Sequence, residues 1–164
     1  MSNDTFDLDR FISAQENVYE TALGEIRNGR KQGHWMWFVF PQIVGLGRTE
    51  VSQLYSIKSR AEAVAYLEHA VLGARLREIS EALLSVEDKS AIDIFGVPDN
   101  MKLRSSMTLF KSISTDNEVF LNVLDRYCAG QEDSQTFRIL VKCRKTQRSV
   151  PGTAFTLISF FSIV

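Results

Sequence analysis

Aromatic and basic side chains cluster in one segment of the first quarter of the chain. Residues 29–42 read Gly-Arg-Lys-Gln-Gly-His-Trp-Met-Trp-Phe-Val-Phe-Pro-Gln. The indoles of Trp35 and Trp37 can stack on a flat ligand, and the arginine and lysine before them can hold an anionic group. The imidazole of His34 can donate a hydrogen bond to a phosphate or carry a proton. The segment is therefore a candidate site for a planar, anionic molecule.

A second polar cluster follows residues 95–98, Phe-Gly-Val-Pro. Asp99 is predicted to cap a helix whose first two turns carry Lys102, Ser105 and Ser106. Because Lys102 and Ser106 are four residues apart, a helix places them on one face. A helix N-terminus stabilises an anion, and a nearby ammonium and hydroxyl groups suit the same ligand. The cluster is thus a second candidate for anion binding.

Our first functional hypothesis joins the two clusters into one pocket for a nucleotide or another phosphorylated compound. An enzymatic step in this pocket stays open, and we assign no reaction type and no cofactor. Its cations would neutralise ligand charge, and one tryptophan would supply stacking. The hypothesis requires the two clusters to converge on a cavity of roughly 300–1,000 Å³. The residues that we assign to it are Gln15, His34, Trp35, Trp37, Gln42, Asp99, Lys102, Arg104, Ser105 and Ser106.

Each cluster also has an ordinary structural interpretation. The aromatic residues of 29–42 can form the centre of a hydrophobic core, with His34 bonded to a backbone carbonyl. The cluster that begins at Asp99 can be a capped helix with a solvated polar stripe. For either segment taken alone, we favour this interpretation.

The standard catalytic and metal motifs are missing from the sequence. It contains no HExxH, CxxC, GxSxG or Walker pattern. The pair Gly45 and Gly47 lacks the third glycine of a dinucleotide fingerprint, since Glu50 stands at that offset. The histidines and cysteines do not have the spacing of metal ligands, and we predict no metal site; they are His34, His69, Cys128 and Cys143.

Hydrophobic spacing predicts that helices position these clusters. Residues 8–26 carry one apolar stripe of helical period and are predicted to form a single helix. Residues 34–40, closed by Pro41, are too short for a typical helix and are predicted to form a buried strand or an irregular buried segment. We find no repeat and no linker. The predicted fold is all-α, a compact multihelical single domain of six or seven short helices over residues 1–140.

Composition bounds the class of protein. The 164 residues are 45% hydrophobic and carry a formal net charge of −1, which is ordinary for a globular domain and argues against a general electrostatic binder of nucleic acid. No apolar run reaches the length that spans a bilayer, and the acidic first residues show no secretory signal. Two cysteines cannot form a disulfide scaffold. We therefore expect a cytoplasmic protein without a transmembrane segment.

The last residues differ in kind from the rest. Residues 141–164 are predicted to be an extension, first basic and then apolar, and we assign no secondary structure to Thr153–Val164. The alternative functional hypothesis is a non-catalytic protein-interaction module, which binds a partner through a helical groove or through this apolar tail. Nucleic-acid binding through Arg138–Arg148 is the weakest hypothesis, because this basic run is short and has no interleaved aromatic residues.

Several long motifs resemble the uncharacterised family called domain of unknown function 1810. The resemblance covers Asp7 to about Leu140 and implies a compact, mostly α-helical single domain, but it implies no activity. Residues after about Val141 lie outside the family pattern. The motifs that carry it include residues 29–42 with their His-Trp-Met-Trp-Phe core, Gly45-Leu-Gly47, Ala65-Tyr-Leu67 with His69, Ile94-Phe-Gly96, and Lys102-Leu-Arg-Ser-Ser-Met-Thr-Leu-Phe110.

Overall fold

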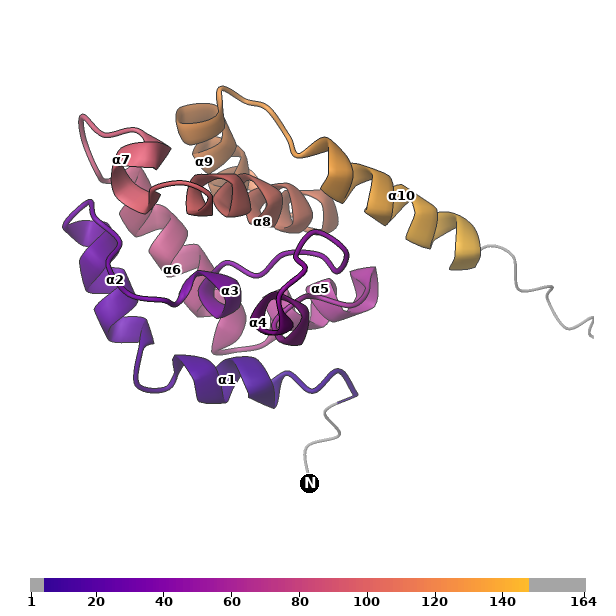
Figure 1. Ribbon diagram of the computed structural model, residues 1–164. Helices are drawn as coiled ribbons and strands as arrows, with labels where there is room; N and C mark the ends of the chain where they lie inside the picture. Colours follow the sequence, from indigo (N-terminus) through magenta and orange to yellow (C-terminus); the bar gives the residue numbers. More distant parts are fainter. Residues whose placement is uncertain (1–4, 148–164) are drawn as a thin grey trace, which may run out of the picture.

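Helices make up nearly all the regular structure of the chain (Figure 1). The computed structural model describes residues 5–147, and side chains up to residue 144. Within this range the backbone forms no strand, and one isolated parallel bridge joins Ile43 to Ile57. The described helices are α1 (Asp9–Gln15), α2 (Tyr19–Arg27), α3 (Met36–Val39), α4 (Glu50–Leu54), α5 (Arg60–Glu68), α6 (Leu72–Leu84), α7 (Ala91–Phe95), α8 (Asp99–Ile113), α9 (Glu118–Cys128) and α10 (Ser134–Gln147).

Helix α8 organises the core. It packs against α5, α7, α9 and α10, whereas α6 packs against α2, α5 and α9. The buried side of α8 carries Leu103, Met107 and Phe110, none of which is exposed. Because so many elements surround α8, most of its length is buried and its two ends emerge at different surfaces. The mostly helical, single-domain fold is confirmed.

The predicted number of helices is wrong, because ten are described instead of six or seven. One reason is that residues 8–26 form two helices, α1 and α2, which run in different directions in Figure 1. A tight turn separates them, in which the amide of Val18 donates to the carbonyl of Gln15 at 3.1 Å. Both helices still bury apolar side chains in the core, Phe11 from α1 and Tyr19 from α2.

The remaining extra helices are single turns. The prediction for residues 34–40 is wrong, because Met36–Val39 is helical, with the Phe40 amide donating to the Met36 carbonyl at 3.0 Å. Pro41 follows directly and cannot continue the turn. Such short helices as α3, α4 and α7 do not repeat the 3.6-residue period often enough for a sequence pattern to reveal them.

Helix α10 continues beyond residue 140, where the helical prediction stops. The Asp133 carboxylate caps it and accepts from the Thr136 amide at 2.9 Å. Thr153–Val164, to which we assign no secondary structure, lies outside the described residues, and the division into a domain and an extension stays a prediction. Within residues 5–147 no helix is both long and apolar enough to cross a bilayer.

Candidate functional site

A carboxylate at the end of α2 shapes the loop that carries the aromatic cluster. Glu25 Oε2 accepts hydrogen bonds from the amides of Gln32 and Gly33, at 2.7 and 3.0 Å, and from Nε1 of Trp35 at 2.8 Å. Burial works to raise the pKa of Glu25, but these bonds outweigh it and hold that pKa below its ordinary value. Glu25 therefore remains charged near neutral pH and fixes the path of the loop.

The two predicted clusters meet at Asp99. Its Oδ2 lies 2.7 Å from Nζ of Lys31, and its Oδ1 lies 2.7 Å from Nζ of Lys102. The exposed fractions of the three side chains are 8% for Lys31, 15% for Asp99 and 20% for Lys102. Burial works to raise the pKa of Asp99, yet hydrogen bonds and charges from both lysines hold it below the ordinary value.

The expected capping role of Asp99 is replaced by this ion pairing. Pro98 is the N-cap residue of α8 and has no side-chain cap, and Asp99 is the first helical residue. A negative charge in the first turn still favours the helix dipole. What the sequence could not show is that Lys31, far away in the chain, reaches the same carboxylate.

An indole and an ammonium come together in the wall of a recess. Nζ of Lys102 lies 4.1 Å from the ring centroid of Trp37, within the range of a cation–π contact. The recess has a volume of about 490 Å³, inside the range of ligand pockets. Its lining comes from the α3 region, the start of α4 and the turn between α7 and α8, and consists of His34, Trp37, Gly47, Arg48, Thr49, Ser52, Phe95, Val97, Pro98, Asp99 and Lys102.

The recess has an excess of positive charge. Arg48 and Lys102 line it with one positive charge each and Asp99 with one negative charge, while Lys31 adds a further positive charge behind Asp99. Arg48 is exposed and forms no ion pair among the residues that the structure describes. The chemistry of the site therefore suits an anion.

Hydroxyl groups and an apolar side complete the recess. Thr49 caps α4, accepting from the Ser52 amide at 3.2 Å, and the Thr49 hydroxyl also donates to Ser52 Oγ at 3.0 Å. A side chain at Gly47 would collide with Ser52, so glycine lets this loop close against α4. Phe95 and Val97, which is 69% exposed, supply apolar surface from the α7–α8 turn.

Four of the ten predicted site residues line the recess, namely His34, Trp37, Asp99 and Lys102. Gln15 is instead buried in the core, where its Nε2 donates to the carbonyl of Phe38 at 2.7 Å and to the hydroxyl of Tyr66 at 3.1 Å. Trp35 is also buried, with its N–H committed to Glu25. Gln42 does not line the recess; its carbonyl accepts from the amide of Ile57 at 2.8 Å.

The other predicted residues of α8 do not reach the recess either. Ser106 is fully buried, and the hydroxyl of Ser105 donates back to the carbonyl of Met101 at 3.2 Å. Arg104 is half-buried near Cys128; burial raises the pKa of that thiol, and the charge of Arg104 lowers it in part. Lys102 and Ser106, four residues apart, therefore differ in environment because neighbouring helices cover the second turn of α8.

Several residues that line the recess were not predicted from the sequence. Arg48, Thr49 and Ser52 follow the glycine pair that we examined only as a dinucleotide fingerprint. A glycine turn followed by a cation and a helix-capping threonine was a usable signal. The apolar side, formed by Phe95, Val97 and Pro98, had no comparable signal, since such residues are equally common in a core.

Comparisons with known proteins identify the family of the chain. A family model described as "Protein of unknown function (DUF1810)" matches residues 5–140. The crystal structure of the conserved hypothetical protein Rv1873 from Mycobacterium tuberculosis is 48% identical, with a TM-score of 0.83, covering 84% of this chain and 99% of that chain. A search of curated proteins gave no match. The chain therefore belongs to the DUF1810 family, as its sequence motifs predict.

Proposed function

We propose that the recess beside α8 binds a small anionic molecule, with a nucleotide or another phosphorylated compound as the ligand class. The observation that carries this proposal is the position of the Lys102 ammonium, held between the Asp99 carboxylate and the Trp37 ring in the wall of a 490 Å³ recess. A cation fixed in this way needs little reordering when a ligand arrives, which reduces the entropic cost of binding.

The distribution of groups supports a ligand with both a charged and an apolar part. Arg48 lies on the α4 side, and its exposed guanidinium can donate to phosphate oxygens, whereas the single protons of the Thr49 and Ser52 hydroxyls already donate to Ser52 Oγ and to the Thr49 carbonyl. Val97 and Pro98 lie on the other side and offer apolar surface. A nucleotide presents this combination, with a phosphate at one end and a flat base at the other.

We propose binding alone for the recess and assign no reaction to it. His34 is exposed and lines the recess, so it could donate to a bound phosphate. Among the described residues that line the recess there is no cysteine, and Asp99 is the one carboxylate. Its two oxygens are already paired with Lys31 and Lys102. We therefore assign charge recognition to Arg48 and Lys102 and no nucleophile to any residue.

A thermal-shift screen with nucleotides, sugar phosphates and inorganic phosphate tests this function. We expect at least one phosphorylated compound to raise the Tm of the wild-type protein, and its unphosphorylated counterpart to leave the Tm unchanged. Arg48→Gln should remove the shift, because it removes an exposed positive charge from the lining of the recess. Arg138→Gln, which removes an exposed arginine outside the recess, should keep the shift. Equal shifts in both variants would refute the assignment.

The alternative hypothesis, a protein-interaction module, names two contact surfaces, a helical groove and the apolar tail. The apolar tail lies outside the described residues. A groove beside α10, however, combines exposed apolar side chains with cations, and we consider it separately below.

A further inference from the structure

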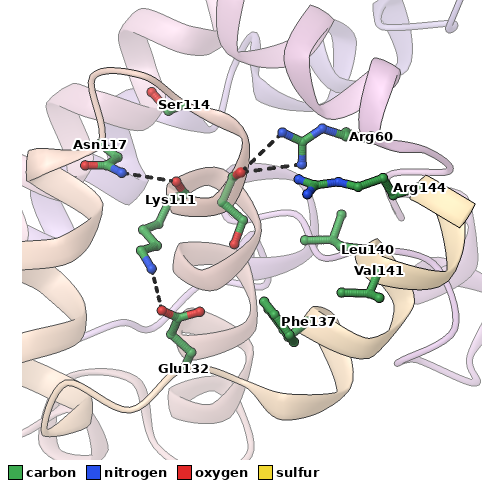
Figure 2. A pocket seen from close by; sticks show the side chains of 10 residues that line it. Arg60, Lys111, Ser114, Asn117, Glu132, Phe137, Leu140, Val141 and Arg144 are labelled. Carbon is green, nitrogen blue, oxygen red and sulfur yellow. Dashed lines mark hydrogen bonds and ion pairs between the residues drawn. The ribbon is translucent and has the colours of Figure 1, made fainter.

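A second hollow lies at the C-terminal end of α8, between that end, the start of α5 and helix α10 (Figure 2). Its volume is about 400 Å³. We call it the α10 groove, and its lining residues are Arg60, Lys111, Ser112, Ser114, Asn117, Glu132, Phe137, Leu140, Val141 and Arg144. Figure 2 shows that Phe137, Leu140, Val141 and Arg144 come from successive turns of α10.

The α10 side of the groove is apolar and only partly covered. Leu140 is 5% exposed and anchors α10 to the core, while Phe137 and Val141 beside it are 54% and 38% exposed. A phenyl ring left half in water gains free energy when a partner covers it. The apolar surface alone does not indicate the chemical class of the partner. The charged residues of the groove do.

Two of the arginines that line the α10 groove are not paired with a carboxylate among the described residues. Lys111 is paired with Glu132 at 2.5 Å. Arg60 donates to the carbonyl of Ser112 through two long contacts of 3.4 Å, and neither Arg60 nor Arg144 forms an ion pair within the described part of the chain. Figure 2 shows both guanidinium groups pointing toward the same part of the groove, above Leu140.

We propose that the α10 groove binds an acidic peptide segment of another protein, whose carboxylates pair with Arg60 and Arg144 and whose apolar side chains cover Phe137 and Val141. Paired guanidinium and carboxylate groups form charge-assisted, often bidentate hydrogen bonds. Aromatic residues and arginine are also enriched at protein interfaces. This inference stands independently of the ligand in the recess.

Charge complementarity argues against the protein's own tail as the occupant. Residues 148–164 contain apolar residues that could cover Phe137, but they include Arg148 and no aspartate or glutamate. Folding this segment onto the groove would bring another cation near Arg60 and Arg144. An acidic segment from outside supplies the missing charge as well as the apolar contact.

Fluorescence anisotropy with the full chain tests the proposal. The probe is a short labelled peptide in which Glu and Leu alternate, compared with peptides in which Gln or Lys replaces every Glu. The test variant is Arg60→Gln/Arg144→Gln, and the matched control is Arg30→Gln/Arg138→Gln, which removes two exposed arginines outside the groove. We expect the test variant to bind the acidic peptide about tenfold more weakly and the control to bind it as the wild type does.

A second pair of variants probes the apolar contact. Phe137→Ser should also weaken binding of the acidic peptide, whereas Ile92→Ser, at an equally exposed position on α7, should not. Equal binding of the Glu and Lys peptides, or equal loss in the Arg30→Gln/Arg138→Gln control, would overturn the proposal. Self-association in sedimentation that Arg60→Gln/Arg144→Gln abolishes would assign the groove to a second copy and would also overturn it.

Discussion

The charged side chains at the two ends of α8 differ in burial and in pairing. At the N-terminal end, the Asp99 carboxylate lies between Lys31 and Lys102, and all three side chains are mostly buried. At the C-terminal end, Lys111 and Glu132 form a partly exposed pair, and Arg60 nearby has no carboxylate partner among the described residues. The first arrangement holds the fold together as well as shaping a recess, whereas the second leaves charge available to a partner.

The two ends of α8 should therefore differ in how well the fold tolerates substitutions of their charged residues. Removing one member of a buried ion pair leaves an unsatisfied charge, which is costly, while an exposed pair contributes little. Substitutions at the two ends of α8 should therefore separate clearly in their effects on stability, and substitutions at the C-terminal end should act mainly on binding.

The largest effect is expected for Asp99→Asn. This change leaves the ammonium groups of Lys31 and Lys102 close together without a neutralising charge, so the free energy of unfolding should fall by about 3 kcal/mol. Asp116→Asn is the control, since that carboxylate is 82% exposed and lies 3.7 Å from Arg77. Its effect should stay below about 0.5 kcal/mol in the same urea titration. Similar losses in both variants would remove the distinction that we draw.

A smaller effect is expected from pH. The pKa of Asp99 is lower in the folded state than its ordinary value of 3.8, so the stability that its charge contributes is fully present above that value. This contribution is lost as the pH falls through the folded-state pKa. The stability difference between wild type and Asp99→Asn should therefore be constant from pH 5 to pH 7, at about the 3 kcal/mol of the buried pair, and shrink below about pH 4.

Urea titrations of the two proteins at a series of pH values would measure this difference. A difference that persists undiminished at the lowest pH where both proteins still fold would show that the Asp99 charge is not its source. A difference that disappears already near pH 6 would contradict the direction of the pKa shift.

The smallest effect is expected at the other end of α8. Glu132→Gln removes the partner of Lys111, whose side chain is 26% exposed, and water can solvate the released ammonium. The free energy of unfolding should change by less than about 0.5 kcal/mol in denaturant titrations. A loss that approaches that of Asp99→Asn would make the two ends of α8 energetically equivalent.

The sequence predicted the all-helical fold class but not the number and boundaries of the helices. The helical period is visible wherever a helix runs for several turns, as in α6 and α9. A single turn such as Met36–Val39 gives no period, and the bend between α1 and α2 interrupts an apolar stripe that continues across it, so the spacing alone does not reveal it. The family resemblance was confirmed, but it adds no function.

The sequence predicted some of the residues that line the recess and wrongly added others that are buried in the core. Trp37 and Lys102 were both assigned to one recess, and they do meet there. Gln15 and Ser106 were assigned to it as well, because polar residues among apolar neighbours indicate either a cavity or a buried residue. The structure places both in the core, and only tertiary packing distinguishes these outcomes.

Tryptophan fluorescence during titration with phosphorylated compounds tests the central claim most directly. Trp37 lines the recess and contacts Lys102, whereas Trp35 is buried with its N–H bonded to Glu25. We expect a saturable change in emission with at least one nucleotide or sugar phosphate, and we expect this change to be absent in Trp37→Phe. A wild-type protein that shows no saturable change with any of these compounds, or a Trp37→Phe variant with the same change as wild type, would contradict the claim.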